Sequence, residues 1–131
     1  MSQTAGKTRI TGVGRVMVPV SDQDRAIDFY VSKLGFEKLA DIPYGNGDRW
    51  VEVGRAGQAT ALALVPPRQG DPIGVETRIA LASSDIDADH ADLRARGVDT
   101  DAEVIRMGGP VPPMFWFRDQ DGNTLLLVQT D

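Results

Sequence analysis

The stretch RIALASSD, from Arg78 to Asp85, places an arginine at the head of an apolar run that ends in serine and aspartate. The same layout occurs 63 residues earlier, where RVMVPVSD extends from Arg15 to Asp22. A layout that returns after a fixed interval is the signature of an internal structural repeat. The two copies therefore predict two similar units, each beginning with a strand that leads into a capped helix.

A helix is predicted directly after each copy. In SDQDRAIDFYVSKLGF, Ser21 or Asp22 can cap the helix, and Gly35 follows the last residue of a pattern with helical spacing. The second copy, SDIDADHADLRARGV, has the same kind of cap and ends at Gly97. Each half of the chain therefore begins with a strand and continues with a helix.

Strand-like segments follow each predicted helix. They are FEKLADIPY, RWVEV and TALALV in the first half, and DAEVIRM, PMFWFR and TLLLVQ in the second. The segments GRAG and DQDGN, which join neighbouring strands, have the composition of hairpin turns. We therefore predict an α+β fold in which residues 1–131 form one domain of two βαβββ modules, 10–65 and 76–131. Segment 66–75, rich in proline and glycine, is the predicted linker.

The composition argues against several classes of partner. The net charge is −5 and the pI is near 4.8, whereas nucleic-acid-binding proteins gather Lys and Arg on one face. No apolar run approaches the roughly 20 residues needed to cross a bilayer, and the first dozen residues lack the apolar middle of a signal peptide. There are no cysteines for disulfides or thiolate metal sites. These features predict a cytoplasmic protein that binds neither nucleic acid nor membrane.

Three phrases, in their order and spacing, resemble the vicinal oxygen chelate superfamily: VPVSDQDRAIDFYVSKLGF, DIDADHADLRARGV and FRDQDGNTLLLVQ. That group includes glyoxalase I, extradiol dioxygenases, fosfomycin-resistance enzymes and bleomycin-resistance proteins. The resemblance covers nearly the whole chain. It implies that the modules form a cupped, mixed eight-stranded sheet around a cavity, and that the protein is a homodimer. In the enzymes of the group, four side chains bind a divalent metal in this cavity.

The four metal-ligand positions that the resemblance implies hold unsuitable residues here. In the first module these positions, one at the start of the first strand and one in the last strand, hold Arg15 and Ala63. In the second module they hold Arg78 and Leu126. Divalent cations prefer carboxylate oxygen or neutral imidazole nitrogen, which none of these side chains offers. We therefore expect no metal and no other cofactor.

Strand alternation assigns the remaining side chains to faces once these four positions are taken to face the cavity. A hairpin at DQDGN places Trp116 opposite Leu126, and a hairpin at GRAG places Glu52 opposite Ala59. Small alanines beside two tryptophans have the composition of a binding pocket. The predicted ligand-binding residues are Arg15, Met17, Trp50, Glu52, Ala61, Ala63, Arg78, Met114, Trp116 and Leu126.

Both arginines have two interpretations. Either they bind a small-molecule ligand, or they are structural and pair with Glu52, Glu76 or a carboxylate of a partner chain, since buried charges are normally paired. Glu52 can form a good ion pair with at most one of the two arginines. An arginine without an internal partner would favour a planar or aromatic ligand with a negative or hydrogen-bond-accepting group.

The sequence is compatible with four functions. The first is a metal-free protein, similar to the bleomycin-resistance branch, that binds an aromatic or amphiphilic compound without transforming it. The alternative is a metal-dependent lyase, isomerase or dioxygenase whose ligands have moved to Glu52, Glu76, Asp48 or another acid. The third is a metal-free enzyme with Glu52 as general base. The last, an interaction module without a small ligand, predicts a filled cavity, which the alanines disfavour.

Overall fold

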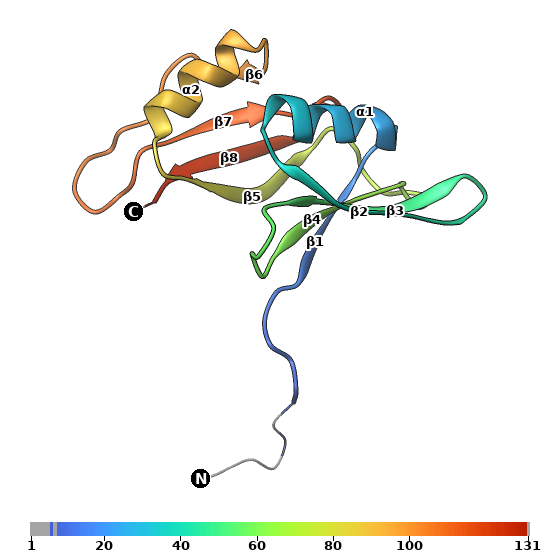
Figure 1. Cartoon of the computed structure of the whole chain (residues 1–131). Helices are drawn as coiled ribbons and strands as arrows, with labels where there is room; N and C mark the ends of the chain where they lie inside the picture. Colours follow the sequence, from blue (N-terminus) through green and yellow to red (C-terminus); the bar gives the residue numbers. More distant parts are fainter. Residues whose placement is uncertain (1–5, 7, 131) are drawn as a thin grey trace.

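The computed structural model describes residue 6 and residues 8–130 and shows two βαβββ units (Figure 1). The first contains β1 (Arg15–Pro19), α1 (Gln23–Asp28), the π-helical turn η1 (Phe29–Lys33), β2 (Glu37–Gly45), β3 (Asp48–Gly54) and β4 (Ala61–Val65). The second contains β5 (Glu76–Ser83), α2 (Ile86–Ala95), β6 (Asp99–Thr100), β7 (Met114–Arg118) and β8 (Thr124–Gln129). The predicted α+β fold of repeated βαβββ modules is thereby confirmed. No helix among the described residues is long and apolar enough to span a membrane.

The eight strands are divided between two four-stranded sheets, with the orders β1-β4-β3-β2 and β5-β8-β7-β6. Each sheet is mixed, because its first strand pairs in parallel with its last and the other pairs are antiparallel. β1 and β5 each form an edge of their sheet. Pro19 lacks an N–H, and the register of β5 shifts between Glu76 and Ala80. Both features oppose further strand pairing at these edges, which helps to keep the sheets separate.

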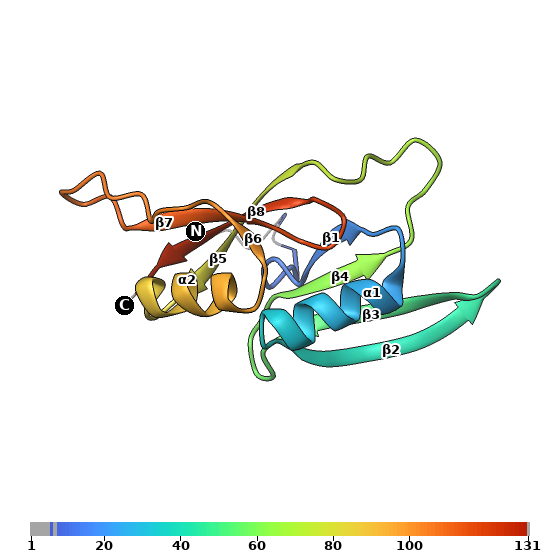
Figure 2. The ribbon, with the colours of Figure 1, turned by 90° about the horizontal axis from the view of Figure 1, so that it is seen from above.

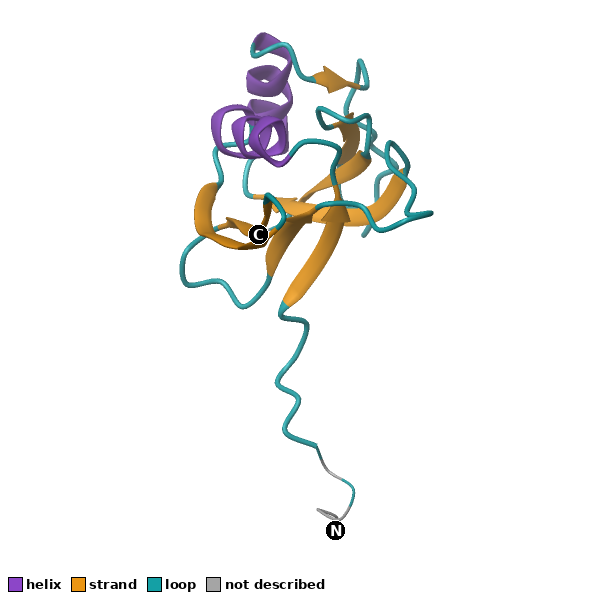
Figure 3. Cartoon of the chain, turned by 90° about the vertical axis from the view of Figure 1, so that its right-hand side faces the viewer, coloured by secondary structure: helices purple, strands orange, loops and turns teal. Residues whose placement is uncertain are grey.

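One face of each sheet packs against the helices and forms the core. In the first sheet this face carries Val18, Val51, Val53, Leu62 and Leu64, and in the second it carries Phe115, Phe117, Leu125 and Leu127. Phe29, Leu34, Ile79 and Leu81 pack against both clusters. The two units therefore share a core on the helix side, and Figures 2 and 3 show both helices on the same side of the sheets. We call the opposite face of each sheet its open face.

The helix signals in the sequence act as predicted. Asp22 caps α1 by accepting from the Arg25 N–H, and Asp85 caps α2 in the same way. The helices meet at their carboxyl ends, where Lys33 Nζ donates to the carbonyl of Arg96 and Arg96 Nη1 donates to the carbonyl of Lys33, both over 2.8 Å. These two residues are 63 positions apart, the interval of the repeat. Such reciprocal contact between equivalent residues is the geometry of a two-fold interface.

The predicted turn DQDGN contains a polar cluster that ties the two units together. Tyr30 is fully buried, and its hydroxyl donates to Asp119 Oδ2 over 2.8 Å. The Ser21 N–H donates to Asp121, and Asn123 Oδ1 accepts from the N–H groups at the end of the linker. The turn therefore fixes the first helix and the linker against the second sheet. Burial and the Asp119 carboxylate raise the pKa of Tyr30 well above its ordinary value.

Two predictions of local structure are wrong. The segment 101–107 is not a continuous strand: β6 contains only Asp99 and Thr100, and a single bridge joins Ile105 to Met114. Prolines and positive-φ glycines directly after this segment prevent a longer ladder. The register at GRAG is also wrong, because the loop extends to residue 60 and Glu52 pairs with Ala63 rather than Ala59.

Candidate functional site

The open face of the first sheet brings together the predicted residues of the first module. Arg15 pairs with Ala61 and Met17 pairs with Ala63 across the parallel ladder. The register error described above is four residues, and because side chains alternate with a period of two, every side chain keeps its predicted face. The face is formed by Arg15, Met17, Trp50, Glu52, Ala61 and Ala63.

A polar network lies on this face around Glu52, which is only 8% exposed. Its Oε2 accepts from Trp50 Nε1 over 2.6 Å and lies 2.9 Å from Arg15 Nε. The hydrogen bond from Trp50 and the charge of Arg15 lower the pKa of Glu52 against the opposing effect of burial. Glu52 is therefore ionised at neutral pH, which makes it a weak general base.

The ion pair leaves part of Arg15 accessible. It uses Nε, and the side chain remains 48% exposed. A guanidinium has further N–H donors on its two terminal nitrogens, in a planar fork suited to a carboxylate. The pair with Glu52 therefore holds Arg15 in place while its outer edge stays available to a ligand. The structural and ligand-binding interpretations of Arg15 are compatible.

The second set of predicted residues lies on the open face of the second sheet. Trp116 pairs with Leu126 as expected, and Met114 is the next inward residue of β7. Arg78 departs from the repeat: it has φ +63 and lies within the register shift of β5, whereas Arg15 lies in a regular strand. No ion pair of Arg78 is found among the described residues. Nor does any hydrogen bond or ion pair there join this set to the first.

A pocket of about 540 Å³ lies next to the first open face. Residues of β1, β2, the end of β4, the linker and the start of β5 line it, and we call it the linker pocket. Of the predicted residues only Met17 lines it. Extending the alternation of β1 and β4 by one step would have found Pro19 and Val65, but no local signal places the linker there. The lining also includes Tyr44, Arg68, Asp71, Val75, Glu76 and Thr77.

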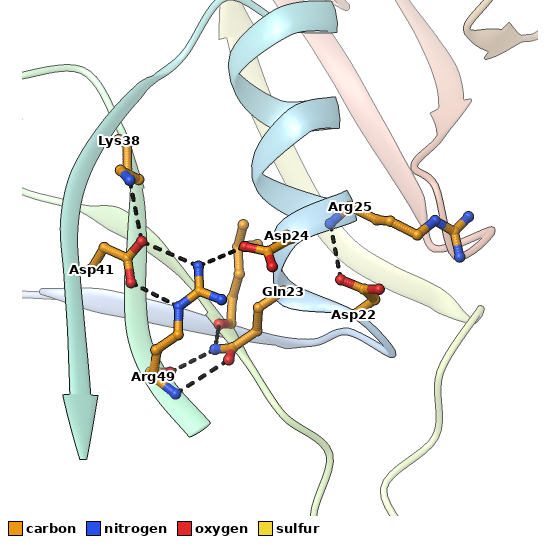
Figure 4. Close-up of polar contacts among 8 residues, drawn as sticks. Asp22, Gln23, Asp24, Arg25, Lys38, Asp41 and Arg49 are labelled. Carbon is orange, nitrogen blue, oxygen red and sulfur yellow. Dashed lines mark hydrogen bonds and ion pairs between the residues drawn. The ribbon is translucent and has the colours of Figure 1, made fainter. Parts of the chain in front are cut away.

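An ion-pair network anchors the strand that carries Trp50 and Glu52. At the start of β3, Arg49 contacts Asp41 through Nε at 2.9 Å and Asp24 through Nη2 at 2.8 Å (Figure 4). Gln23 Nε2 donates to the carbonyls of Arg49 and Leu64, which ties α1 to two strands. The hydrogen bonds from Arg49 and Lys38 lower the pKa of Asp41 to about 2. This network ties the turn end of the β2–β3 hairpin, which projects from the body in Figure 2, to α1.

The residues present do not fit a divalent metal. Among residues 6 and 8–130, no three His, Asp or Glu side chains are placed to share an ion. Glu52 is occupied by Arg15 and Trp50, and the four positions implied by the resemblance hold two cationic and two apolar side chains. Within the described part of the chain, no cluster of acids is present for the relocated site of the metal-enzyme alternative.

The fold and sequence together define the class of protein. Residues 12–127 match the model of the Glyoxalase/Bleomycin resistance protein/Dioxygenase superfamily, and the chain belongs to this family. It is 32% identical to the uncharacterized protein YetH of Bacillus subtilis (strain 168), over 92% of this chain and 99% of that one.

Two solved structures have closely similar folds. TnmS3, an antibiotic binding protein from Streptomyces sp. CB03234, is 38% identical with a TM-score of 0.81, covering 95% of this chain and 100% of that chain. A superfamily member from Sphaerobacter thermophilus DSM 20745 is 36% identical with a TM-score of 0.82, covering 94% of this chain and 100% of that chain. The similarity to TnmS3, the antibiotic binding protein, extends beyond fold to sequence.

Proposed function

We propose that this protein binds a small aromatic or amphiphilic compound on the open face of the first sheet and does not transform it. The carrying observation is the network in which a buried Glu52 holds both Arg15 and Trp50. A fixed guanidinium beside a fixed indole, above alanines, offers a hydrogen-bonding fork and a ring surface to one planar ligand. The antibiotic-binding relative supports this proposal.

Binding requires no resident metal in this proposal. The indole stacks on the ligand ring, and the terminal nitrogens of Arg15 donate to a carboxylate or another acceptor. A charge-assisted hydrogen bond contributes about 1.5–3 kcal/mol and aromatic stacking about 0.5–1.5 kcal/mol. Glu52 acts as a positioning residue, because its lowered pKa keeps it ionised and bound to both partners.

We also propose that the protein is a homodimer in which the second copy packs against the open faces around the bound ligand. Met17 is 61% exposed and Ile42 is 58% exposed on the first of these faces. Apolar side chains gathered on one face of a sheet favour burial against another surface. A second copy supplies such a surface under closed two-fold symmetry.

Calorimetric titration with 2-naphthoate, a planar aromatic carboxylate, tests the binding site. We expect Arg15→Ala and Trp50→Ala each to weaken binding about tenfold or more. Arg15→Lys, which keeps the charge but loses the fork, should lie between wild type and Arg15→Ala. Arg94→Ala on α2 is the control, because α2 covers the helix-side face. Equal affinity for the wild type and both alanine variants would refute the proposal.

A further inference from the structure

Three exposed apolar side chains gather at the linker pocket. Met17, Tyr44 and Val75 are 61%, 59% and 40% exposed, and all three line it. Large exposed apolar side chains that converge on one concave surface indicate a binding site. The volume of about 540 Å³ lies within the range of small-molecule pockets.

The strand edges beside the pocket are unsuited to an extended peptide. The Ala61 N–H donates to the Gly14 carbonyl and the Val20 N–H donates to the Val65 carbonyl, so the even-numbered residues of β1 bond to β4. Met17 and Pro19 therefore direct their backbone groups to the unpaired edge, where Pro19 has no N–H to donate. Across the pocket, β5 is irregular at Arg78. Neither edge can extend a regular ladder, which favours a compact ligand.

The charges on the pocket wall favour a cation. Asp71 is neutralised by Arg68, whose backbone N–H and Nε lie 2.8 and 3.4 Å from its Oδ2. Among the described residues, Glu76 accepts a single hydrogen bond, from the Arg78 backbone N–H to Oε2 over 2.7 Å. No ion pair of Glu76 is found in the part of the chain that the structure describes. The wall therefore presents one carboxylate without a cationic partner.

Tyr44 adds an aromatic wall to this carboxylate. It belongs to the β2–β3 hairpin, whose turn end the Arg49 network holds in place. An aromatic ring attracts a cation to its face, and a nearby carboxylate supplies a charge-assisted hydrogen bond. Valine and proline side chains complete an apolar compartment. The combination suits an aromatic body that carries an ammonium group.

We propose that the linker pocket is a second ligand site, which binds a small aromatic ammonium compound with Glu76 as its counter-ion. Tyr44 and Val75 contact the aromatic body. Of the predicted ligand-binding residues this site includes only Met17, and it prefers the opposite ligand charge, so it goes beyond the proposed function. Two probes with the same ring separate the two sites: 2-naphthoate for the open face and 2-naphthylmethylamine, a cation at neutral pH, for the pocket.

An NMR titration of the full chain tests the proposal. We expect 2-naphthylmethylamine to shift the backbone amide signals of Val75, Glu76 and Thr77. Glu76→Gln should weaken its binding about tenfold, because the amide loses the charge but can still accept from the Arg78 N–H. Glu103→Gln removes an exposed carboxylate outside the pocket lining and should leave the affinity unchanged.

Three results would overturn the second site. They are an unchanged affinity in Glu76→Gln, equal or tighter binding of 2-naphthoate at the same amides, and no binding of the cationic probe at millimolar concentration. Trp50→Ala separates this proposal from the proposed function. It should weaken 2-naphthoate alone and leave 2-naphthylmethylamine unaffected, so each proposal can fail without the other.

Discussion

Removing the hydroxyl of Tyr30 should destabilise the protein through a single buried hydrogen bond. The hydroxyl donates to Asp119 Oδ2 over 2.8 Å, and both residues are buried. Asp119 keeps three other donors: Asn123 Nδ2 and the N–H groups of Asp121 and Asn123. The carboxylate therefore stays mostly satisfied in Tyr30→Phe, and the loss is that of one hydrogen bond to a charged group. Such a bond contributes about 1.5–3 kcal/mol.

Urea unfolding measures this loss as a change in the free energy of unfolding. Tyr44→Phe is the matched control, because Tyr44 is 59% exposed and the same substitution there should cost less than about 0.5 kcal/mol. An equal effect of the two substitutions would refute the assigned role of the Tyr30–Asp119 bond. The raised pKa of Tyr30 also makes the free energy of unfolding depend on pH. The stabilisation by Tyr30 is present below pH 10 and is lost as pH rises through the higher folded pKa. Tyr30→Phe should lack that alkaline loss.

Three further predictions concern the hairpin anchor, the linker and the assembly. The carboxyl of Asp41 should titrate near its folded pKa of about 2 in a carbon-detected NMR titration, and Arg49→Gln should return it toward 3.8; an unchanged titration would exclude Arg49 as the cause. Gly74→Ala should cost more stability than Gly57→Ala in urea unfolding, since both glycines have positive φ but only at Gly74 would a Cβ lie 2.8 Å from the carbonyl of Asp121. Light scattering should give about twice the 14.2 kDa chain mass, and a concentration-independent mass of one chain would contradict the homodimer.

The repeat made most of the fold predictable from sequence. Copies 63 residues apart mark equivalent strands and helix caps, and period-two alternation assigns faces without an accurate register. For this reason Glu52 keeps its predicted face although its partner is Ala63 rather than Ala59. The pairing of Trp116 with Leu126 was predictable because DQDGN is a short turn of known chemistry.

Contacts between the two units were not predictable in the same way. The linker pocket depends on where a ten-residue linker lies between two strand edges, and no local pattern determines that position. The positive φ of Arg78 is equally hidden, because the repeat suggests that it resembles Arg15. Whether each arginine forms an ion pair depends on its distance from a carboxylate in the folded chain. That distance is short for Arg15, which pairs with Glu52.

The indole N–H signal of Trp50 tests the central claim most directly. This group donates to Glu52 beside Arg15, so a ligand on the open face changes its surroundings at once. The sequence contains two tryptophans, and Trp116→Phe identifies the Trp50 signal. On titration with 2-naphthoate, we predict a saturable shift of this signal that is strongly weakened in Arg15→Ala. A Trp50 signal that stays unmoved while 2-naphthoate saturates the protein would contradict the account.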